Sequence, residues 1–252
     1  MAKKPPKLRL AHLYPKQMNI YGDRGNIMCL KRRCELRGIE FEVTELGPGD
    51  RLRPKETDMI FAGGAQDREQ RLVAEDLIAT KAGALKEAAD HDVVVLAVCG
   101  GYQLAGRFYR SADGNELPGA GILDIWTVHP GPNAKRFIGN VVVRWNGETL
   151  VGFENHGGRT HLGPGAKPLA EVVSGFGNNG EDGTEGAVTR NVYGTYLHGS
   201  LLPKNPALAD FLIETALRRK EKGLRLAELD DRIEDMAHAE AVHLATRRAI
   251  IG

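Results

Sequence analysis

The residues on either side of Cys99 in the sequence are those expected around a nucleophilic thiol. The run before it, Val93 to Val98, is apolar and mostly β-branched, which is typical of a strand buried on both faces of a parallel sheet. Gly100 and Gly101 follow directly and allow a tight turn into a helix, so we expect the sulfur to be presented at this turn. The first N–H groups of that helix favour a thiolate and stabilise an oxyanion. A lone cysteine is more often a packed structural residue, but the two glycines favour a nucleophile that attacks a carbonyl.

A cysteine nucleophile needs a base, and the chain has eight histidines. His198 ends the run that starts at Tyr193 and precedes Gly199, so it is predicted to stand just past a strand end, as Cys99 does. His156 lies in a cluster of polar residues and glycines and is the rival base, which we rank second. The sequence therefore predicts a catalytic pair of Cys99 and His198.

The elements that must position this pair alternate along the first half of the chain. Strands are predicted at 8–13, 39–46, 58–62 and 93–98, and helices at 26–37 and 69–89. This alternation predicts an α/β fold with a mostly parallel, doubly wound central sheet flanked by helices. Functional loops then lie at the carboxyl ends of the strands, where the Gly63–Gly64 and Cys99–Gly100 loops are both expected.

From Gly119 onward the sequence pattern differs from that of the preceding residues. Short apolar runs separated by glycines predict additional β structure in the C-terminal half, at 121–127, 137–145, 150–155, 170–174, 187–190 and 192–197. The acidic, Asn-rich and Gly-rich stretch 175–186 predicts a surface loop. Helices are predicted at 206–220 and, with an amphipathic pattern, at 226–250. We divide the chain into one domain at 8–220, a helical extension at 221–252 and a disordered tail at 1–7.

Composition narrows the class of protein. The 252 residues are 42% hydrophobic and 27% charged, as in an ordinary globular protein with a sizeable core. The net charge of +1 provides no field that would hold a nucleic acid, so no nucleic-acid partner is expected. Three cysteines make no disulfide framework, and no apolar stretch reaches membrane-spanning length. These features predict a cytoplasmic protein with no transmembrane segment.

The sequence also lacks the common motifs for bound metals and nucleotides. It has no Cys-x-x-Cys and no His-Glu-x-x-His pattern, so no metal site is expected. It has no P-loop and no glycine fingerprint after the first strand, so no cofactor is expected either. If the product of this chain feeds an ATP-driven reaction, another polypeptide must supply the ATP chemistry.

Three segments resemble the class I glutamine amidotransferase family in its cobyric-acid-synthase-like branch. They are Cys99-Gly100-Gly101-Tyr102-Gln103, the loop from Gly63 to Asp67, and the stretch from Tyr196 to Gly199. Further runs, at 19–26, 67–70, 152–160 and 194–205, are similar to the glutaminase subunits of lipid II isoglutaminyl synthases within that branch. The resemblance extends over residues 8–219 and implies a class I amidotransferase-like α/β fold.

The resemblance implies an activity and a partner. Members of this kind hydrolyse L-glutamine and pass ammonia to a MurT-like Mur ligase subunit in a heterodimer. That partner handles lipid II and uses ATP to amidate the D-glutamate of its stem peptide. Carried over by position, the nucleophile falls on Cys99, the base on His198 and the glutamine-binding arginine on Arg136. The resemblance further implies substrate contacts at Gly64, Gly100 and Gln103.

One position departs from the family pattern. Many class I amidotransferases have a glutamate two residues after the histidine, and Ser200 stands there in this chain. A serine cannot supply the anion that orients and stabilises a charged imidazole. The sequence thus predicts a dyad of Cys99 and His198 with an unidentified orienting group. The oxyanion is expected to bind the N–H of Gly100 and one N–H of the Gly63–Gly64 loop.

Three alternatives remain open at this point. The chain could be the glutaminase of another cobyric-acid-synthase-like amidotransferase, although in those enzymes the glutaminase is fused to a P-loop domain. It could be a non-catalytic sensor of the same fold that uses Cys99 as a redox-active thiol. It could also be a hydrolase or peptidase on a related strand-to-helix turn, with a substrate other than free glutamine.

Overall fold

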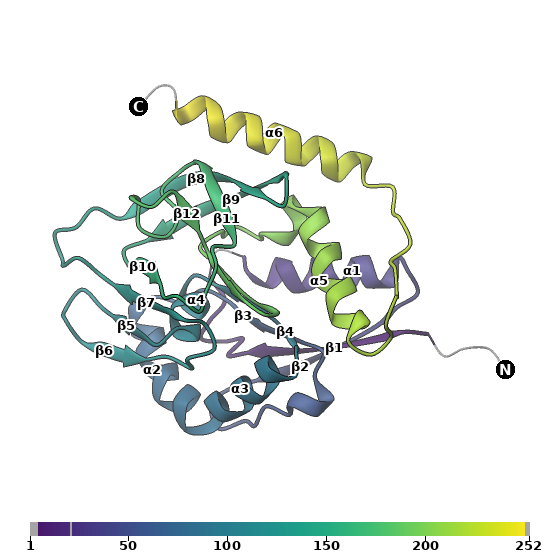
Figure 1. The fold of residues 1–252 in the computed structure, drawn as a ribbon, viewed down its shortest axis with the longest axis horizontal. Coiled ribbons are helices and arrows are strands. Elements are labelled where there is room, and N and C mark those ends of the chain that lie inside the picture. Colours follow the sequence, from purple (N-terminus) through teal and green to yellow (C-terminus); the bar gives the residue numbers. More distant parts are fainter. Residues whose placement is uncertain (1–4, 21, 250–252) are drawn as a thin grey trace.

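The computed structural model describes residues 5–20 and 22–249, so part of the predicted tail and the last predicted helical residue, Ile250, lie outside the described residues. A six-stranded sheet with the order β13-β14-β4-β3-β1-β2 forms the centre of the molecule (Figure 1). Its strands are β1 (Lys7–Leu13), β2 (Glu40–Leu46), β3 (Met59–Ala62), β4 (Val94–Val98), β13 (Ala187–Thr189) and β14 (Val192–Thr195). All neighbours are parallel except β13 and β14, which are antiparallel.

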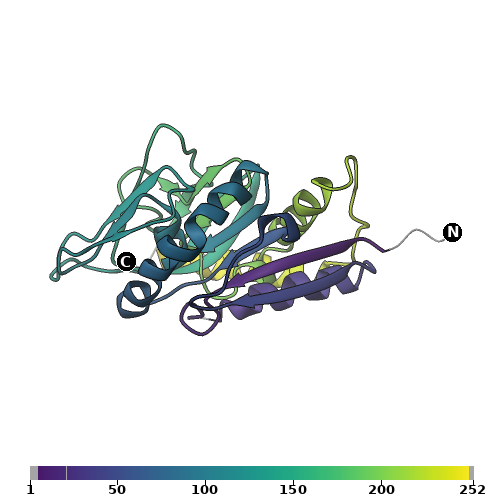
Figure 2. The ribbon, with the colours of Figure 1, turned by 90° about the horizontal axis from the view of Figure 1, so that it is seen from below.

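Helices cover both faces of this sheet. The helices of the described chain are α1 (Arg24–Glu35), α2 (Asp67–Asp76), α3 (Ala82–Asp90), α4 (Gly100–Ala105), α5 (Pro206–Arg218) and, packed on another sheet, α6 (Arg232–Ala249). The short helical turns are η1 (Pro54–Glu56), η2 (Leu77–Lys81) and η3 (Leu202–Lys204). Helices α1 and α5 lie on one face, and α2 and α3 lie on the other (Figures 1 and 2). The predicted helix at 69–89 is α2, a π-helical turn and α3 in succession.

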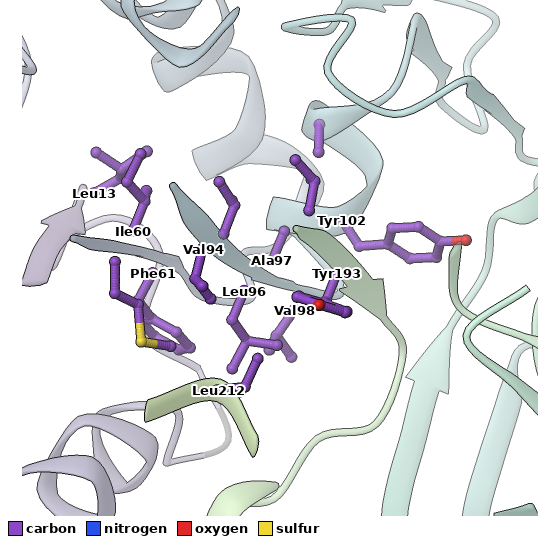
Figure 3. Close-up of a cluster of buried hydrophobic side chains, with 14 of the residues drawn as sticks. Leu13, Ile60, Phe61, Val94, Leu96, Ala97, Val98, Tyr102, Tyr193 and Leu212 are labelled. Atoms are coloured by element: carbon purple, nitrogen blue, oxygen red, sulfur yellow. The ribbon is translucent and has the colours of Figure 1, made fainter. Parts of the chain in front are cut away.

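The core is centred on β4. Every residue of this strand is buried, as the apolar run in the sequence predicts for a strand that is covered on both faces. Phe61 of β3 and Leu212 of α5 pack close to it on one side, and Tyr102 of α4 lies beyond its carboxyl end (Figure 3). The turn that carries Cys99 is therefore fixed to a strand that is buried along its whole length.

The C-terminal half adds two smaller sheets. One has the order β10-β7-β5-β6 and the other β12-β11-β8-β9. Their strands are β5 (Phe108–Arg110), β6 (Glu116–Pro118), β7 (Ile125–Val128), β8 (Phe137–Trp145), β9 (Glu148–His156), β10 (Arg159–Leu162), β11 (Ala170–Ser174) and β12 (Thr184–Glu185). The predicted fold class, with extra β structure in this half, is confirmed. Strands β5, β6, β10 and β12, each two to four residues long, were not predicted.

The prediction of a surface loop at 175–186 is wrong for several of its residues. Asn178 and Glu185 are fully buried, and Glu185 ends β12. Asn178 accepts hydrogen bonds from Tyr102 Oη at 3.0 Å and from Gly186 N at 3.0 Å, and it donates one to Gly186 O at 2.9 Å. Polar residues can be buried when their hydrogen bonds are satisfied, and composition alone does not reveal such partners.

Helix α6 packs on the sheet that contains β8 and β9 (Figure 1). Ala245 of the helix is buried against Val142 and Val151 of these strands. His238 fixes the helix further, because its Nδ1 lies 2.7 Å from Lys204 O and its Nε2 lies 2.9 Å from Thr149 Oγ1. Ala241, Val242 and Ala245 of the predicted helix thus pack on this protein's own sheet, whereas its larger apolar residues Ile233, Met236 and Leu244 are exposed. None of the helices in the described part of the chain is both long and apolar enough to cross a membrane.

A buried carboxylate ties the amino-terminal edge of the central sheet to the end of α5. The oxygens of Asp58 lie 3.1 Å from Arg9 Nη2 and 2.6 Å from Lys220 Nζ, and Arg219 Nη2 is 3.2 Å away. Burial alone would raise the pKa of Asp58, but the hydrogen bonds from Arg9 and Lys220 outweigh it and lower the pKa. The stabilisation is therefore present above the ordinary pKa of an aspartate and is lost as the pH falls through the lowered value.

We predict that Asp58→Asn lowers the free energy of unfolding by about 2 kcal/mol, because it leaves three cations without their shared anion. Asp90→Asn is the control, since Asp90 and its partner Arg190 are both exposed, and it should change stability by less than about 1 kcal/mol. Urea denaturation followed by circular dichroism measures both values. Equal effects of the two substitutions would contradict this role of Asp58.

Candidate active site

Four neighbouring parallel strands end at the same edge of the central sheet. In spatial order they are β14, β4, β3 and β1. The loops that follow them carry His198, Cys99, Gly64 and Asp23, respectively. Residues that are far apart in the sequence meet here because the carboxyl ends of parallel strands lie side by side.

Cys99 occupies a strained turn between β4 and α4. Its φ of 49° and ψ of −103° are unusual for a residue with a side chain and cost about 1–3 kcal/mol, which the surrounding contacts must offset. Its N–H donates to Thr195 O at 2.8 Å, and a Cβ on Gly100 would lie 2.8 Å from Ala65 N. The cysteine is only 5% exposed, less than the sequence suggests, but it lines a pocket.

The other two cysteines lie in a different environment on α1. Burial raises the pKa of Cys29 to about 11 and that of Cys34 to about 12. Both thiols are therefore protonated and unreactive at neutral pH, because the thiolate is the nucleophilic form.

His198 is fully buried beside Cys99. Its backbone is bridged to Phe153 of β9, with N–H···O distances of 2.8 and 3.2 Å, and β14 ends before it at Thr195. Burial alone would lower the pKa of this histidine. The charge of a Cys99 thiolate, followed by the interaction with Asp23, more than offsets that effect and raises the pKa of His198 to about 10. The raised pKa keeps the imidazole of His198 in its protonated form beside the sulfur of Cys99.

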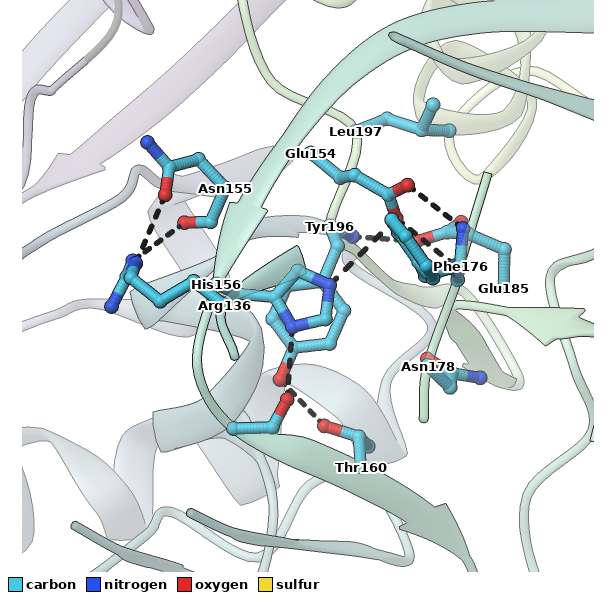
Figure 4. Close-up of polar contacts among 12 residues, drawn as sticks. Arg136, Glu154, Asn155, His156, Thr160, Phe176, Asn178, Glu185, Tyr196 and Leu197 are labelled. Atoms are coloured by element: carbon cyan, nitrogen blue, oxygen red, sulfur yellow. Dashed lines mark hydrogen bonds and ion pairs between the residues drawn. The ribbon is translucent and has the colours of Figure 1, made fainter. Parts of the chain in front are cut away.

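His156 is held in a different way. Its ring stacks on Tyr196 with a centroid distance of 3.6 Å, and its Nδ1 lies 2.9 Å from Gly158 O. Its Nε2 faces Glu154 at 3.9 Å (Figure 4). Burial lowers the pKa of this histidine, so it is neutral at pH 7. His156 lines the same pocket as Cys99, but these contacts are those of a packed wall residue.

The pocket above Cys99 has a volume of about 470 Å³. Arg136 lies at its exposed rim, where its Nε and Nη2 donate to Asn155 Oδ1 at 3.1 Å and Asn155 O at 3.0 Å (Figure 4). Asp67, at the start of α2, lines the pocket as well and accepts a hydrogen bond from Tyr109 Oη at 3.0 Å. A cation and an anion therefore both face the space that leads to the thiol.

A buried hydrogen-bond network forms one side of this pocket. Gln103 accepts from Gln70 Nε2 at 2.8 Å and donates to Tyr196 Oη at 3.1 Å, and Tyr196 Oη lies 2.7 Å from Thr160 Oγ1. Hydrogen bonds between buried side chains hold such a wall in place. Gln103 lines the pocket, although its amide already has these protein partners.

The two predicted oxyanion donors differ in their surroundings. Gly64 N–H donates to the Asp23 carboxylate and is thereby engaged. Ala65 N, the next amide of this loop, lies beside Gly100 at the thiol turn, as the close approach described above shows. The amides of Gly100 and Ala65 are thus the pair best placed near Cys99.

Of the predicted site residues, the structure brings Cys99, His198 and Gly64 together and places Arg136 and Gln103 around the same pocket. Sequence reasoning missed Asp23, Ala65 and Asp67. All three lie within or next to the motifs 19–26 and 63–67, and this proximity was the available signal. Within residues 5–20 and 22–249, no group of three or more His, Cys, Asp or Glu side chains is arranged to hold a metal ion.

Comparison with known proteins places this fold and site in a family. The model of the CobB/CobQ-like glutamine amidotransferase domain matches residues 9–206. Two relatives are subunits GatD of glutamine-hydrolysing lipid II isoglutaminyl synthases. The Staphylococcus aureus subunit is 40% identical over 243 residues, or 96% of this chain and 98% of that one. The Streptococcus pneumoniae subunit is 43% identical over 218 residues, or 86% and 83%.

More distant matches agree on the fold. A glutamine amidotransferase structure from Thermotoga maritima has a TM-score of 0.54 at 17% identity and covers 95% of this chain and 94% of that one. A cobyric acid synthase from Pelotomaculum thermopropionicum is 32% identical over 222 residues, but the match covers only 40% of that synthase.

The fold and the sequence together define a glutamine amidotransferase, and the chain belongs to the CobB/CobQ-like family of these proteins. Its likeness to the two GatD subunits extends over most of all three chains. The resemblance to class I glutamine amidotransferases, which the motifs around Cys99 and His198 indicated, is confirmed.

We predict that Gly64→Ala slows ammonia release from glutamine by about 10²-fold, because the new Cβ would lie 2.8 Å from His198 Cε1 and displace the ring. Gly139→Ala is the control, since a Cβ there meets nothing within 4 Å and the backbone needs no positive φ. A coupled assay of ammonia measures both rates. Normal turnover by Gly64→Ala would show that the ring of His198 does not need this space.

Proposed function

We propose that this chain hydrolyses L-glutamine to glutamate and ammonia, with Cys99 as nucleophile and His198 as acid and base. The observation that carries the proposal is the buried pair itself. Cys99 lines a pocket. His198 lies beside Cys99, and its pKa is raised by the neighbouring thiolate. The family to which the chain belongs supports the same reaction.

The first half of the reaction begins from the ion pair. The Cys99 thiolate attacks the side-chain carboxamide carbon of glutamine, a C–S bond forms, and the carbonyl electron pair moves to oxygen. The N–H groups of Gly100 and Ala65 stabilise this oxyanion. The His198 imidazolium gives its proton to the departing nitrogen, and ammonia leaves. A γ-glutamyl thioester and a neutral imidazole remain.

The second half restores the enzyme. Neutral His198 takes a proton from a water molecule, whose oxygen attacks the thioester carbonyl. The C–S bond breaks, glutamate leaves, and the thiolate and imidazolium are regenerated. His198 must hold a proton before each attack and regain one after it, and the neighbouring thiolate, which raises its pKa, favours the protonated form at the start of the cycle.

The charges of the pocket match a free amino acid. Arg136 at the rim is suited to pair with the α-carboxylate of glutamine, and Asn155 keeps its guanidinium in place. Asp67 is suited to receive the α-ammonium group. A peptide amide or a protein side chain lacks one or both of these charges, so this arrangement favours free glutamine over the substrates of a peptidase.

We further propose that the ammonia is delivered to a partner. Free ammonia becomes mostly ammonium in water at pH 7 and loses its nucleophilicity, so a sheltered transfer to a synthetase is needed. The GatD relatives are named as subunits of a lipid II isoglutaminyl synthase. The partner that fits is a MurT-like, ATP-dependent Mur ligase. It would form a heterodimer with this chain in the cytoplasm and amidate the D-glutamate of lipid II.

The division of the chain follows from the same proposal. Residues 8–220 would form the glutaminase domain, since the pocket, the loops and the strands described above lie within it, apart from Lys7, the first residue of β1. Residues 221–252 would form a helical extension, whose helix α6 packs on β8 and β9.

We predict that, in the complex with the ligase partner, Cys99→Ala abolishes amidation of lipid II driven by glutamine but leaves amidation driven by added ammonium chloride intact. The ligase needs only ammonia and ATP, so the loss should be confined to the glutaminase step. Cys29→Ala is the control and should retain both activities, because its thiol is protonated at neutral pH. Mass spectrometry of lipid II measures the product. Glutamine-driven amidation by Cys99→Ala would overturn the assignment of the nucleophile.

For substrate binding, we predict that Arg136→Ala raises the KM for glutamine about 10- to 100-fold and changes kcat much less. The expected cost is that of a charge-assisted hydrogen bond to the α-carboxylate, about 1.5–3 kcal/mol. Arg144→Ala is the matched control, because Arg144 lies on β8 as an exposed arginine paired with Glu171. Steady-state ammonia release gives both constants. An unchanged KM for Arg136→Ala would contradict the proposed contact between Arg136 and the α-carboxylate of glutamine.

A further inference from the structure

The carboxylate of Asp23 faces the ring of His198. Asp23 lies in the loop between β1 and α1, and both side chains are fully buried. Oδ1 of Asp23 is 3.8 Å from Nδ1 of His198. This oxygen makes no hydrogen bond to any residue in the described part of the chain. A buried anionic oxygen of this kind is costly unless a positive charge stabilises it.

The position of Asp23 in the fold also sets it apart. It is the N-cap residue of α1, where an aspartate ordinarily accepts a hydrogen bond from the first turn of its own helix. Its side chain makes no such bond. Instead, Oδ2 accepts the N–H of Gly64, and Oδ1 is left pointing at the histidine. The side chain is thus directed away from the helix and toward the site.

The loop that carries Asp23 is fastened to the loop that carries His198. Ser200 Oγ donates a hydrogen bond to Gly22 O at 2.7 Å. Gly25 lacks a Cβ, and a Cβ there would collide with Ser200. Ser200, the residue found in place of the expected glutamate, therefore holds the Asp23 loop against the histidine.

We propose that Asp23 is the positioning residue of His198. From the β1–α1 loop, Asp23 supplies the anion that a glutamate supplies in many other class I amidotransferases. The inference rests on the proposed glutaminase function and identifies the orienting group that the sequence leaves open. Asp23 fixes the ring so that Nδ1 carries a proton toward the carboxylate and Nε2 is directed at Cys99.

The other anionic groups near His198 are arranged differently. Cys99 at the end of β4 is the reaction partner. Glu185 of β12 lies within electrostatic range of His198, but its oxygens are bound by Tyr196 N at 2.6 Å and by Thr195 Oγ1. Burial raises the pKa of Glu185 to about 7, which weakens its negative charge at neutral pH. Asp23 is therefore the carboxylate best suited to act on the ring.

The test is Asp23→Asn in the full-length chain. The amide oxygen of asparagine can still accept the Gly64 N–H, so the loop contact is kept and the charge alone is removed. Asp50→Asn is the matched control, because Asp50 also accepts an N–H from a loop glycine, Gly47, at 2.8 Å. Thermal unfolding checks that each variant is folded. The measurements are kcat and KM for glutamine, and the pKa of His198 by NMR, with its resonance assigned through His198→Gln.

We expect Asp23→Asn to lower kcat by about 10²- to 10⁴-fold with little change in KM, and to lower the pKa of His198 by about 1 unit or more. Asp50→Asn should match the wild type. A merely structural role would leave the pKa and kcat of Asp23→Asn unchanged, and that result would overturn the inference. If the wild type releases no ammonia, the proposed function fails, and the NMR titration still decides whether Asp23 acts on His198.

Discussion

The pairing of Cys99 with His198 inside a buried site is the interaction on which the rest of the site depends. Burial opposes the charge on the histidine, whereas the thiolate and Asp23 support it, and the pKa of about 10 is the outcome. Opposite charges in a poorly solvated site attract strongly, but the site tolerates them only when their positions are fixed. This need explains the strained backbone at Cys99 and the absence of a Cβ at Gly64, because each brings one member of the pair within reach of the other.

The two halves of the chain contribute different parts of the site. The parallel strands of the first half and β14 place Cys99, His198 and Asp23 at one edge, where a parallel sheet gathers its loops. The β structure of the second half supplies the wall, in which Arg136 and Asn155 flank the pocket and His156 stacks on Tyr196. The bridge between His198 and Phe153 joins the two parts, since β9 fixes the backbone of the histidine and also carries Asn155. The geometry of the substrate pocket and that of the base are thereby linked through a single strand.

Much of this arrangement could be predicted from the sequence, and the remainder could not for identifiable reasons. The buried run before Cys99 and the glycines after it predicted both strand β4 and its turn, because burial and tight turning leave direct compositional signals. Strands β8 and β11 were predicted with their observed bounds. Asp23 was missed because an aspartate before a helix is an ordinary cap in sequence, and only the packing of two distant loops turns its side chain toward His198. The burial of Glu185 was missed because its hydrogen-bond partners come from another strand.

The proposed function requires that Cys99, alone among the three thiols, is activated within a site that recognises glutamine. Its most direct test is reaction of the wild-type chain with diazo-oxo-norleucine, a glutamine-like electrophile, followed by mass spectrometry of the intact protein and of its peptides. We expect a single adduct on the peptide that contains Cys99, formed more slowly when excess L-glutamine is present and absent in His198→Gln. An adduct on Cys29 or Cys34, or labelling of Cys99 that neither glutamine nor His198→Gln affects, would contradict it.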